Sequence, residues 1–280
     1  MPLSEAREEY KNLWRGARIA LRVLSIVENH NVTELSFDSN QLTTGIYYMI
    51  FSQPCEEYNH FAAIMKRPGF HHLYLSFLVG YNGIYDWGGF KSGYFSHAVS
   101  LAKELTYIHL TVTVEGGDSA NDPVVPLKEI LPVQEWPSLH HLGLSYFSVS
   151  TSELINLLSL VPTSLRSIEL GFLKFPNDAR RWSELLERIR DELDWKKREE
   201  TMRPAVRILM EGFSRTPGRF VLLTDEVVNF LYGSGENPIE GMSTRNPKFG
   251  MGTSHDFLEA EYTRPSLSMK DLAQLGIFKY

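Results

Sequence analysis

Residues 138–172, "SLHHLGLSYFSVSTSELINLLSLVPTSLRSIELGF", carry one apolar pattern twice. The segment LHHLGL at 139–144 returns as LRSIEL at 165–170, so a frame of the form L-x-x-L-x-L is kept while every residue between its positions changes. A frame of this kind, repeated at intervals of roughly 20 to 50 residues, is typical of solenoid proteins. The pattern therefore predicts further copies along the chain.

Four further copies occur: VTELSF at 32–37, FHHLYL at 70–75, LTYIHL at 105–110 and a looser VRILM at 206–210. The intervals between successive starts are irregular, at 38, 35, 34, 26 and 41 residues. Apolar and polar residues alternate at the end of each copy, so we expect a short strand with the frame on its buried face. The strands are predicted near residues 32–37, 70–76, 105–112, 139–145, 165–171 and 206–210.

The segments between the copies have helical patterns. Ser150-Thr-Ser-Glu153 is a capping box, and leucines recur after it at helical spacing until Pro162. A second amphipathic helix is expected after Asn177 or Asp178. Earlier helices are predicted over 43–66, 95–104 and, more briefly, 124–131. Because a strand, a helix and a strand of the same sheet are joined by a right-handed crossover, the strands should be parallel.

These elements predict an α/β fold, an irregular leucine-rich-repeat solenoid with parallel strands on its concave face and helices on its convex face. Residues 1–31 would form an N-terminal helical cap, because Leu13, Ala17, Leu21 and Leu24 have helical spacing. The solenoid would span 32–212. A folded C-terminal cap is expected over 213–280, which contains a strand-like RFVLL and a helix-like TDEVVNFLYG.

Composition narrows the possible partners. The 280 residues carry a formal charge of −6 and a pI near 5.9, which argues against a nucleic-acid partner, since phosphate binding needs clustered Lys and Arg. The single cysteine, Cys55, cannot form an intrachain disulfide. The charged N-terminal segment lacks the apolar core of a signal peptide, and no apolar run reaches the ~18 residues of a membrane span. We expect an intracellular protein, cytoplasmic or nuclear, with no membrane partner.

The candidate site is the polar face of the predicted strands. In parallel register, His72 and His141 share a row with Tyr107 between them, and His109 lies one row over. We expect this face to be exposed and to bind a protein partner, because tyrosine side chains often dominate interface energetics. Ordinary cross-strand stabilisation is the alternative role for each residue. The candidate binding residues are Glu34, Ser36, His72, Tyr74, Tyr107, His109, His141 and Glu169.

Catalytic and metal-binding chemistry is less favoured by the sequence. No G-x-S-x-G nucleophile elbow is present, and the adjacent Ser254, His255 and Asp256 do not by themselves make a triad. At strand spacings of ~4.8 Å, the three histidines at 72, 109 and 141 could only just reach a shared zinc ion. We expect no enzyme activity, catalytic residue, cofactor or metal, and keep this histidine cluster as an open alternative.

Several longer stretches resemble a known family. They are "IFSQPCEEYNHFAAIMKRPGFHHLYL", "ILPVQEWPSLHHLGLS", "LVPTSLRSIELGFL", "FLYGSGENP" and the closing "LAQLGIFKY". Over roughly residues 30–280 the chain resembles the C-terminal leucine-rich-repeat region of filamentous-fungal F-box proteins. That resemblance implies the substrate-recognition part of a cullin-RING ubiquitin ligase receptor, in which an N-terminal F-box binds a Skp-type adaptor and the repeats hold the protein to be ubiquitinated.

The F-box itself is not evident. An F-box opens with Leu-Pro-x-Glu, whereas the one Leu-Pro here, Leu131-Pro132, has its glutamate one position late and meets Pro137 almost at once. We interpret it as a loop that ends a short helix. A Skp-type adaptor is therefore expected as a partner only if an F-box exists upstream. The alternative function is a stand-alone structural or scaffold repeat protein with no ligase link.

Overall fold

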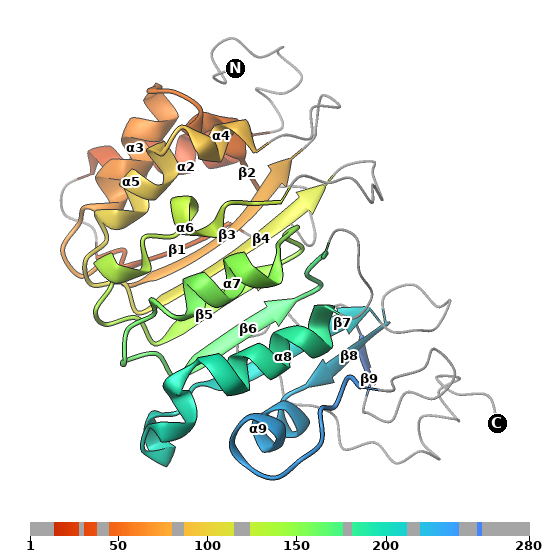
Figure 1. Ribbon diagram of the computed structural model, residues 1–280. Coiled ribbons are helices and arrows are strands. Elements are labelled where there is room, and N and C mark those ends of the chain that lie inside the picture. The colour runs from red at the N-terminus through yellow and green to blue at the C-terminus, as the bar shows by residue number, and fades with distance from the viewer. Residues whose placement is uncertain are drawn as a thin grey trace.

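The computed structural model describes residues 14–27, 31–37, 45–79, 87–114, 124–175, 181–211, 219–240 and 251–253. These residues form an α/β structure, as the sequence predicts, and it is built around one nine-stranded sheet (Figure 1). The strand order is β1-β3-β4-β5-β6-β7-β8-β9, and β2 also pairs with β3. The first six strands of this path are parallel, which confirms the expected strand direction.

Six strands lie in the stretches that carry the apolar frames. They are β1 (Glu34–Phe37), β3 (His72–Val79), β4 (Tyr107–Val114), β5 (His141–Ser145), β6 (Ser167–Gly171) and β7 (Ala205–Glu211). Their register aligns the frames, because Leu35, Leu73, Ile108, Leu142, Ile168 and Val206 are successive partners across the sheet. One apolar row therefore runs through all six strands.

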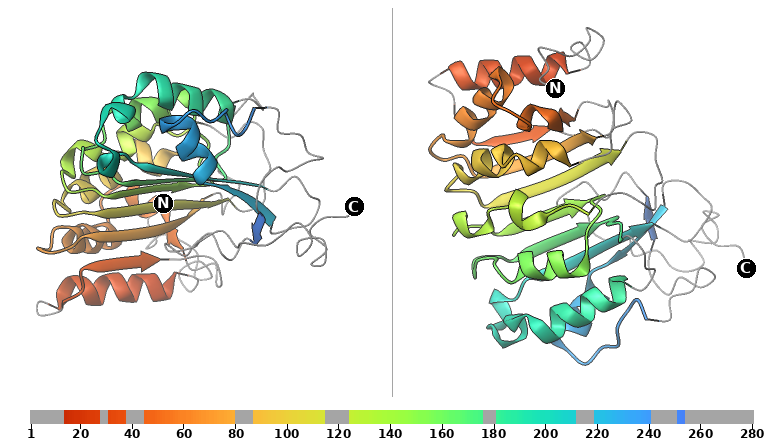
Figure 2. Two further views of the ribbon diagram at one scale, coloured as in Figure 1. Left: turned by 90° about the horizontal axis from the view of Figure 1, so that it is seen from below. Right: turned by 45° about the horizontal axis from the view of Figure 1, so that its top comes forward.

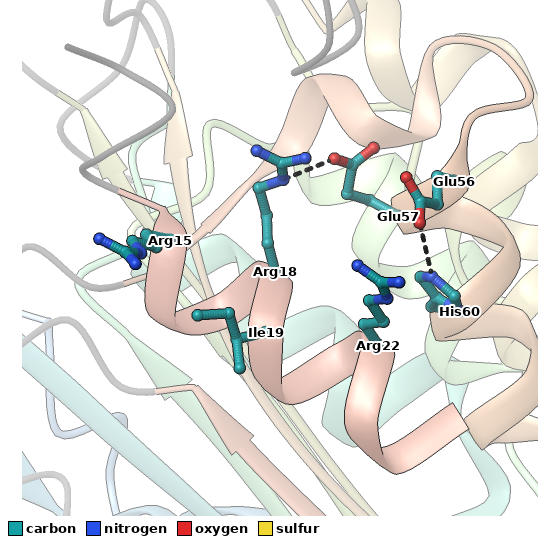
Figure 3. Close-up of a pocket in the computed structure, with 7 residues that line it drawn as sticks. All are labelled: Arg15, Arg18, Ile19, Arg22, Glu56, Glu57 and His60. Carbon is teal, nitrogen blue, oxygen red and sulfur yellow. Dashed lines mark hydrogen bonds and ion pairs between the residues drawn. The ribbon is translucent and has the colours of Figure 1, made fainter. Parts of the chain in front are cut away.

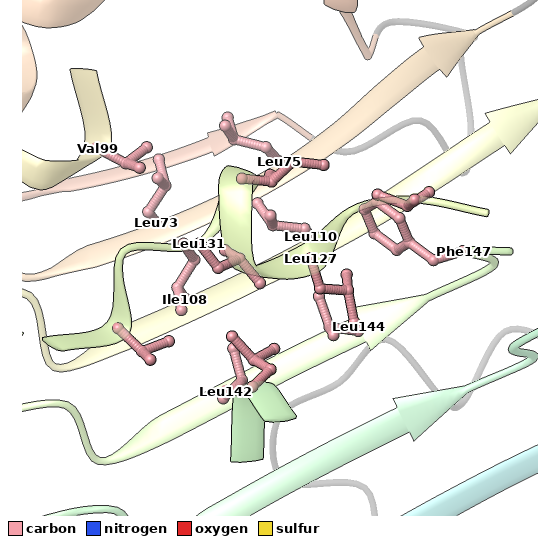
Figure 4. Close-up of a cluster of buried hydrophobic side chains, with 14 of the residues drawn as sticks. Leu73, Leu75, Val99, Ile108, Leu110, Leu127, Leu131, Leu142, Leu144 and Phe147 are labelled. Carbon is pink, nitrogen blue, oxygen red and sulfur yellow. The ribbon is translucent and has the colours of Figure 1, made fainter. Parts of the chain in front are cut away.

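The apolar rows form the core together with the covering helices. Leu73, Leu75, Leu142 and Leu144 are completely buried, and Figure 4 shows their side chains gathered with those of the overlying helices. Full burial of one such side chain stabilises the fold by about 1.5–3 kcal/mol. Trp136 ties the segment before β5 to α5 (Tyr94–Ser100), since its indole Nε1 donates to the Val99 carbonyl at 3.0 Å.

The helices follow the strands in alternation, and α5, α6, α7 and α8 lie over one face of the sheet (Figure 1). As predicted, Ser150 caps α7 by accepting a hydrogen bond from the Glu153 amide at 3.1 Å. The helical elements are α2 (Arg15–Ile26), α3 (Glu56–Met65), α4 (Gly88–Lys91), α5 (Tyr94–Ser100), α6 (Leu127–Ile130), α7 (Thr151–Leu158), α8 (Arg181–Glu192) and α9 (Asp225–Tyr232), with 3-10 turns at Tyr48–Phe51, Val133–Glu135, Asp194–Lys197 and Glu200–Met202.

The Leu131-Pro132 stretch has the structure expected of a loop. The short helix α6 ends at Ile130, and a single 3-10 turn, Val133–Glu135, follows Pro132. Leu131, before Pro132, and Trp136, directly after the turn, are both buried in the core. This stretch is thus a connection between β4 and β5.

The expectation of one helix over 43–66 is wrong. This segment contains β2 (Ile46–Tyr47), a 3-10 turn and then α3. Pro54 disfavours a continuous helix, and α3 instead begins at Glu56 with Cys55 as its N-cap, whose Sγ accepts from the Tyr58 amide at 3.4 Å. Gly45 lets β2 approach β3, since a Cβ at residue 45 would lie 2.5 Å from the Ser76 carbonyl oxygen.

Both ends of the sheet carry further elements. At the first end α2 packs against α3 and buries Leu21, while residues 1–13, with Leu13, are outside the described part (Figure 2). At the other end β8 (Arg219–Leu223) and β9 (Met251–Thr253) continue the sheet in antiparallel pairing, and α9 follows β8. The strand and helix expected there are confirmed, and most of the remaining C-terminal cap lies outside the described residues.

Candidate functional site

The residues that alternate with the frames form rows across the face of the sheet opposite the apolar core. Register makes Glu34, His72, Tyr107, His141, Ser167 and Ala205 successive partners, and we call this the first row. The second row, two residues further along each strand, consists of Ser36, Tyr74, His109, Gly143, Glu169 and Arg207. All eight predicted site residues therefore lie in two adjacent rows, in the register that the sequence predicts.

The first row contains a stack of three rings. His72 stacks on Tyr107 with centroids 4.0 Å apart and planes 4° from parallel, and Tyr107 stacks on His141 at 4.2 Å and 6°. Neighbouring strands lie about 4.8 Å apart, so planar side chains in register can stack face to face. All three residues are half-buried, and Glu34 beyond them is exposed. The first row, which we also call the ring row after this ring stack, is thus an ordered and partly accessible strip.

The second row is buried, which corrects the expectation that this whole face is exposed. Tyr74 is 8% exposed, His109 2% and Glu169 4%, whereas Ser36 at the first strand is exposed. On this face the first row is therefore more accessible than the second, whose side chains on β3, β4 and β6 are buried. Of the predicted binding residues, these three buried ones are not available to a partner in this structure.

Gly143 explains how His109 fits into the second row. A Cβ at position 143 would lie 2.2 Å from the Nδ1 atom of His109, so the imidazole occupies the space that a side chain would take. Gly171 has the same relation to Ser145, whose Oγ would be 2.7 Å from an added Cβ. Each glycine thus leaves space on its strand, and a polar side chain from the preceding strand occupies that space.

A buried polar network follows from this packing. His109 shares a hydrogen bond with Ser145 through Nε2 at 3.1 Å, and its Nδ1 lies 3.9 Å from Oε1 of Glu169. The Arg207 guanidinium donates to Oε2 of Glu169 at 3.2 Å. Tyr74 packs beside His109, with ring centroids 5.0 Å apart. The network links strands β3 to β7 and stabilises the sheet.

Burial shifts the protonation of this network. Desolvation lowers the pKa of His109 to about 3, so the imidazole is neutral near pH 7, and its approach to Glu169 is a polar contact rather than an ion pair. Desolvation raises the pKa of Glu169 to about 7, against the opposing effect of Arg207. In the first row, burial lowers the pKa of His141 to about 3 and raises the pKa of Tyr107.

Ser145, His109 and Glu169 follow one another in the network as serine, histidine and acid do in the catalytic triad of a hydrolase. Their geometry, however, is not suited to catalysis. Ser145 is completely buried, and a nucleophile must meet its substrate. The distance of 3.9 Å between His109 and Glu169 is also beyond a hydrogen bond. The Ser254-His255-Asp256 segment lies outside the described residues. We therefore assign the buried network a structural role.

The histidines do not converge on a common point. The Tyr107 ring lies between those of His72 and His141, and His109 uses its Nε2 for Ser145. Within the described ranges, no group of three or more His, Cys, Asp or Glu side chains is arranged to hold a metal ion. The ring stack itself, rather than a shared ligand, brings these residues together.

The sequence did not predict a second feature, a groove between α2 and α3. The groove between α2 and α3 is a cavity of about 240 Å³, lined by Arg15, Arg18, Ile19, Arg22, Glu56, Glu57 and His60 (Figure 3). The signal was the spacing of the arginines, three, four and seven residues apart, which places them along one side of a helix. Their counterparts on α3 lie more than thirty residues further along the chain, so the sequence alone does not pair them.

Comparison of the chain with protein-family models, with curated proteins and with solved structures finds no match. The resemblance to F-box proteins therefore rests on the quoted sequence stretches. None of the helices in the described part of the chain is long and apolar enough to span a membrane.

Proposed function

We propose that this protein is a leucine-rich-repeat solenoid that binds a protein partner along its first row. The observation that carries the proposal is the ring stack His72-Tyr107-His141, which is ordered by stacking, half-buried and more accessible than the row beside it. Pre-ordered rings lose little entropy on binding, and tyrosine presents both apolar area and a hydroxyl group.

Repeated backbone geometry supports the solenoid. At the entry to each strand, one carbonyl oxygen accepts from two successive amides of the next unit. The Thr33 carbonyl accepts from His71 and His72, and the His71 carbonyl from Thr106 and Tyr107. The carbonyls of Thr106 and His140 repeat the arrangement with the two following units. Four copies of one hydrogen-bond pattern are what stacked units of a repeat protein would show.

The backbone conformation at the end of β5 recurs at the end of β6. Tyr146 and Phe172 follow these strands, both have positive φ, at 64° and 50°, and their rings stack at 4.7 Å. Such backbone conformations are uncommon for bulky residues, so their recurrence at equivalent positions supports a shared unit. The aromatic residues at this edge pack unit on unit, as the frame leucines do inside.

The partner class is proposed from the sequence resemblance to F-box proteins. On that basis the ligand is a protein destined for ubiquitination, and a Skp-type adaptor is a partner only for a product that carries an F-box. The alternative is a scaffold protein with no ligase connection. The buried network around His109 and Glu169 favours a structural role for the second row in either case.

Replacing the ring stack should reduce partner binding far more than stability. For Tyr107→Ala we expect at least about a thirtyfold loss of affinity, corresponding to an anchor worth 2 kcal/mol. Loss of two cross-strand contacts should cost at most roughly 1 kcal/mol each in folding. Partners captured from cell extract are to be quantified by mass spectrometry for wild type and variant, and affinity is then measured with the purified partner.

His140→Ala is the matched control, because His140 is exposed and adjoins the ring row without belonging to it. It should retain wild-type binding. Melting temperatures measured in parallel separate loss of the surface from loss of the fold. Equal partner recovery for wild type and a folded Tyr107→Ala variant would show that the ring row is not the binding surface.

A further inference from the structure

A second surface lies on the outer side of α2, away from the ring row. Its apolar residues are unusually exposed: Ile19 is 52% exposed, Val23 51%, Ile26 60% and Val27 46%. Ile19, Val23 and Ile26 are spaced i, i+4, i+7 and form a stripe along the helix. Contiguous apolar surface of this kind is typical of interaction sites.

The arginines of α2 run beside this stripe, on the side that faces α3. Of the three guanidinium groups on α2, that of Arg18 forms an ion pair with the buried Glu57 at 2.9 Å. The guanidinium groups of Arg15 and Arg22 form no hydrogen bond or ion pair with any described residue, although both side chains line the cavity (Figure 3). Within the described part of the chain, two cationic groups thus lie without an acidic partner next to an apolar strip.

The acids of the groove are already engaged. Glu57 is paired with Arg18, and Glu56 lies 3.3 Å from His60 Nε2. The described residues of α2 include no Asp or Glu, in a chain whose formal charge is −6. This surface therefore differs in charge from the molecule as a whole, and charge complementarity points to an anionic ligand.

The groove is held in place by contacts between α2 and the α3 region. Arg67 donates to the carbonyls of Ser25 and Val27 at 3.2 and 2.8 Å, and the Ser25 hydroxyl is hydrogen-bonded to His60 at 2.6 Å. Trp14, at the start of α2, is buried and stacks on Tyr47 with centroids 4.5 Å apart. A preformed surface of this kind loses little conformational freedom when a ligand binds.

We propose that this surface binds an acidic amphipathic helix of a partner protein. Arg15 and Arg22 are seven residues apart on α2, or about 10 Å along its axis, which matches acidic residues two turns apart on a second helix. Apolar residues of the partner helix, placed between its acidic residues, would pack on Ile19, Val23 and Ile26. This is the helix-in-groove mode of recognition. This inference is independent of the ring row and of the function proposed for it.

The probe is a fluorescein-labelled helical peptide of about 18 residues, long enough to be helical when bound, with leucines at i, i+4 and i+7 flanked by glutamates. Fluorescence anisotropy should show saturable binding that weakens with added salt. Arg15→Gln with Arg22→Gln should weaken binding by about tenfold, as expected for two exposed ion pairs. Ile19→Ser with Val23→Ser should also weaken it, and these exposed positions leave the fold intact.

One control variant loses the same number of positive charges elsewhere on the protein, and one control peptide lacks the negative charges. Lys91→Gln with Lys128→Gln removes two exposed positive charges from other helices and should leave binding unchanged. A peptide with glutamine for each glutamate should bind weakly. Equal binding by wild type and both α2 variants, or no binding by wild type, would overturn the proposal. Vesicles of phosphatidylcholine and phosphatidylserine form a separate arm, and vesicle binding through α2 without peptide binding would assign the surface to membranes instead.

Discussion

Replacing Leu142 by aspartate should prevent the protein from folding. Leu142 is completely buried in the apolar row that runs through the six frame strands, between Ile108 and Ile168 on the neighbouring strands. The substitution removes packing worth about 2–5 kcal/mol and places an unpaired carboxylate in the core at a further cost of several kcal/mol. A domain is stable by only about 5–15 kcal/mol, so most molecules should be unfolded or aggregated.

Circular dichroism during thermal unfolding measures this effect. His140→Asp is the matched control, because it introduces the same charge two residues away at an exposed position. It should change the melting temperature little. A cooperative Leu142→Asp transition at the wild-type temperature would show that the frame does not face the core.

Acid should destabilise the protein from about pH 6.5 downward. Burial lowers the pKa of His109 and of His141 from 6.5 to about 3, so below pH 6.5 the unfolded chain binds two protons that the native state does not. Glu169 has the opposite effect on stability as the pH falls. Its pKa is raised from 4.5 to about 7, so the native state binds a proton there before the unfolded chain does. Between pH 6.5 and 4.5 the net difference from these groups is one proton, or about 1.4 kcal/mol per pH unit.

Glu169→Gln removes the opposing group, so the loss of stability in this pH range should become about twice as steep. His141→Asn should make it shallower by one proton. Urea unfolding at a series of pH values gives these slopes directly, with His140→Asn as a control at an exposed histidine. Identical slopes for wild type and the Glu169→Gln and His141→Asn variants would contradict the buried network.

The strand positions and their register could be predicted because a strand has a period of two. Once Leu73 and Leu75 are assigned to the core, His72 and Tyr74 must lie on the other face. The frame repeats in each copy, so the same assignment aligns neighbouring strands. This is why the sequence placed Tyr107 between His72 and His141.

Burial of the second row could not be predicted in the same way. Alternation assigns a residue to a face of the sheet, but what covers that face depends on the rest of the fold. Gly143 and Gly171 were the available signals, since glycine in a strand often marks a close approach of another group. Their partners, His109 and Ser145, come from the preceding strand and become apparent only when the rows are aligned.

The arginine groove was missed for a related reason. Arg18 and Glu57 form an ion pair across two helices that are separated in the sequence by β1, β2 and a 3-10 turn. The sequence also predicts a helix over 43–66, whereas α3 begins only at Glu56. Without that start, the side of α3 that faces α2 cannot be assigned.

Site-specific photo-crosslinking tests the central claim, partner binding along the first row, most directly. A benzoylphenylalanine is placed at Glu34 or Ala205, exposed positions at the two ends of that row, so that the ring stack remains intact. A third protein carries it at His140 as a control. We predict that irradiation in cell extract crosslinks the same partner from both row positions, and that Tyr107→Ala abolishes these crosslinks. A partner crosslinked from His140 alone, or row crosslinks unchanged by Tyr107→Ala, would contradict the account.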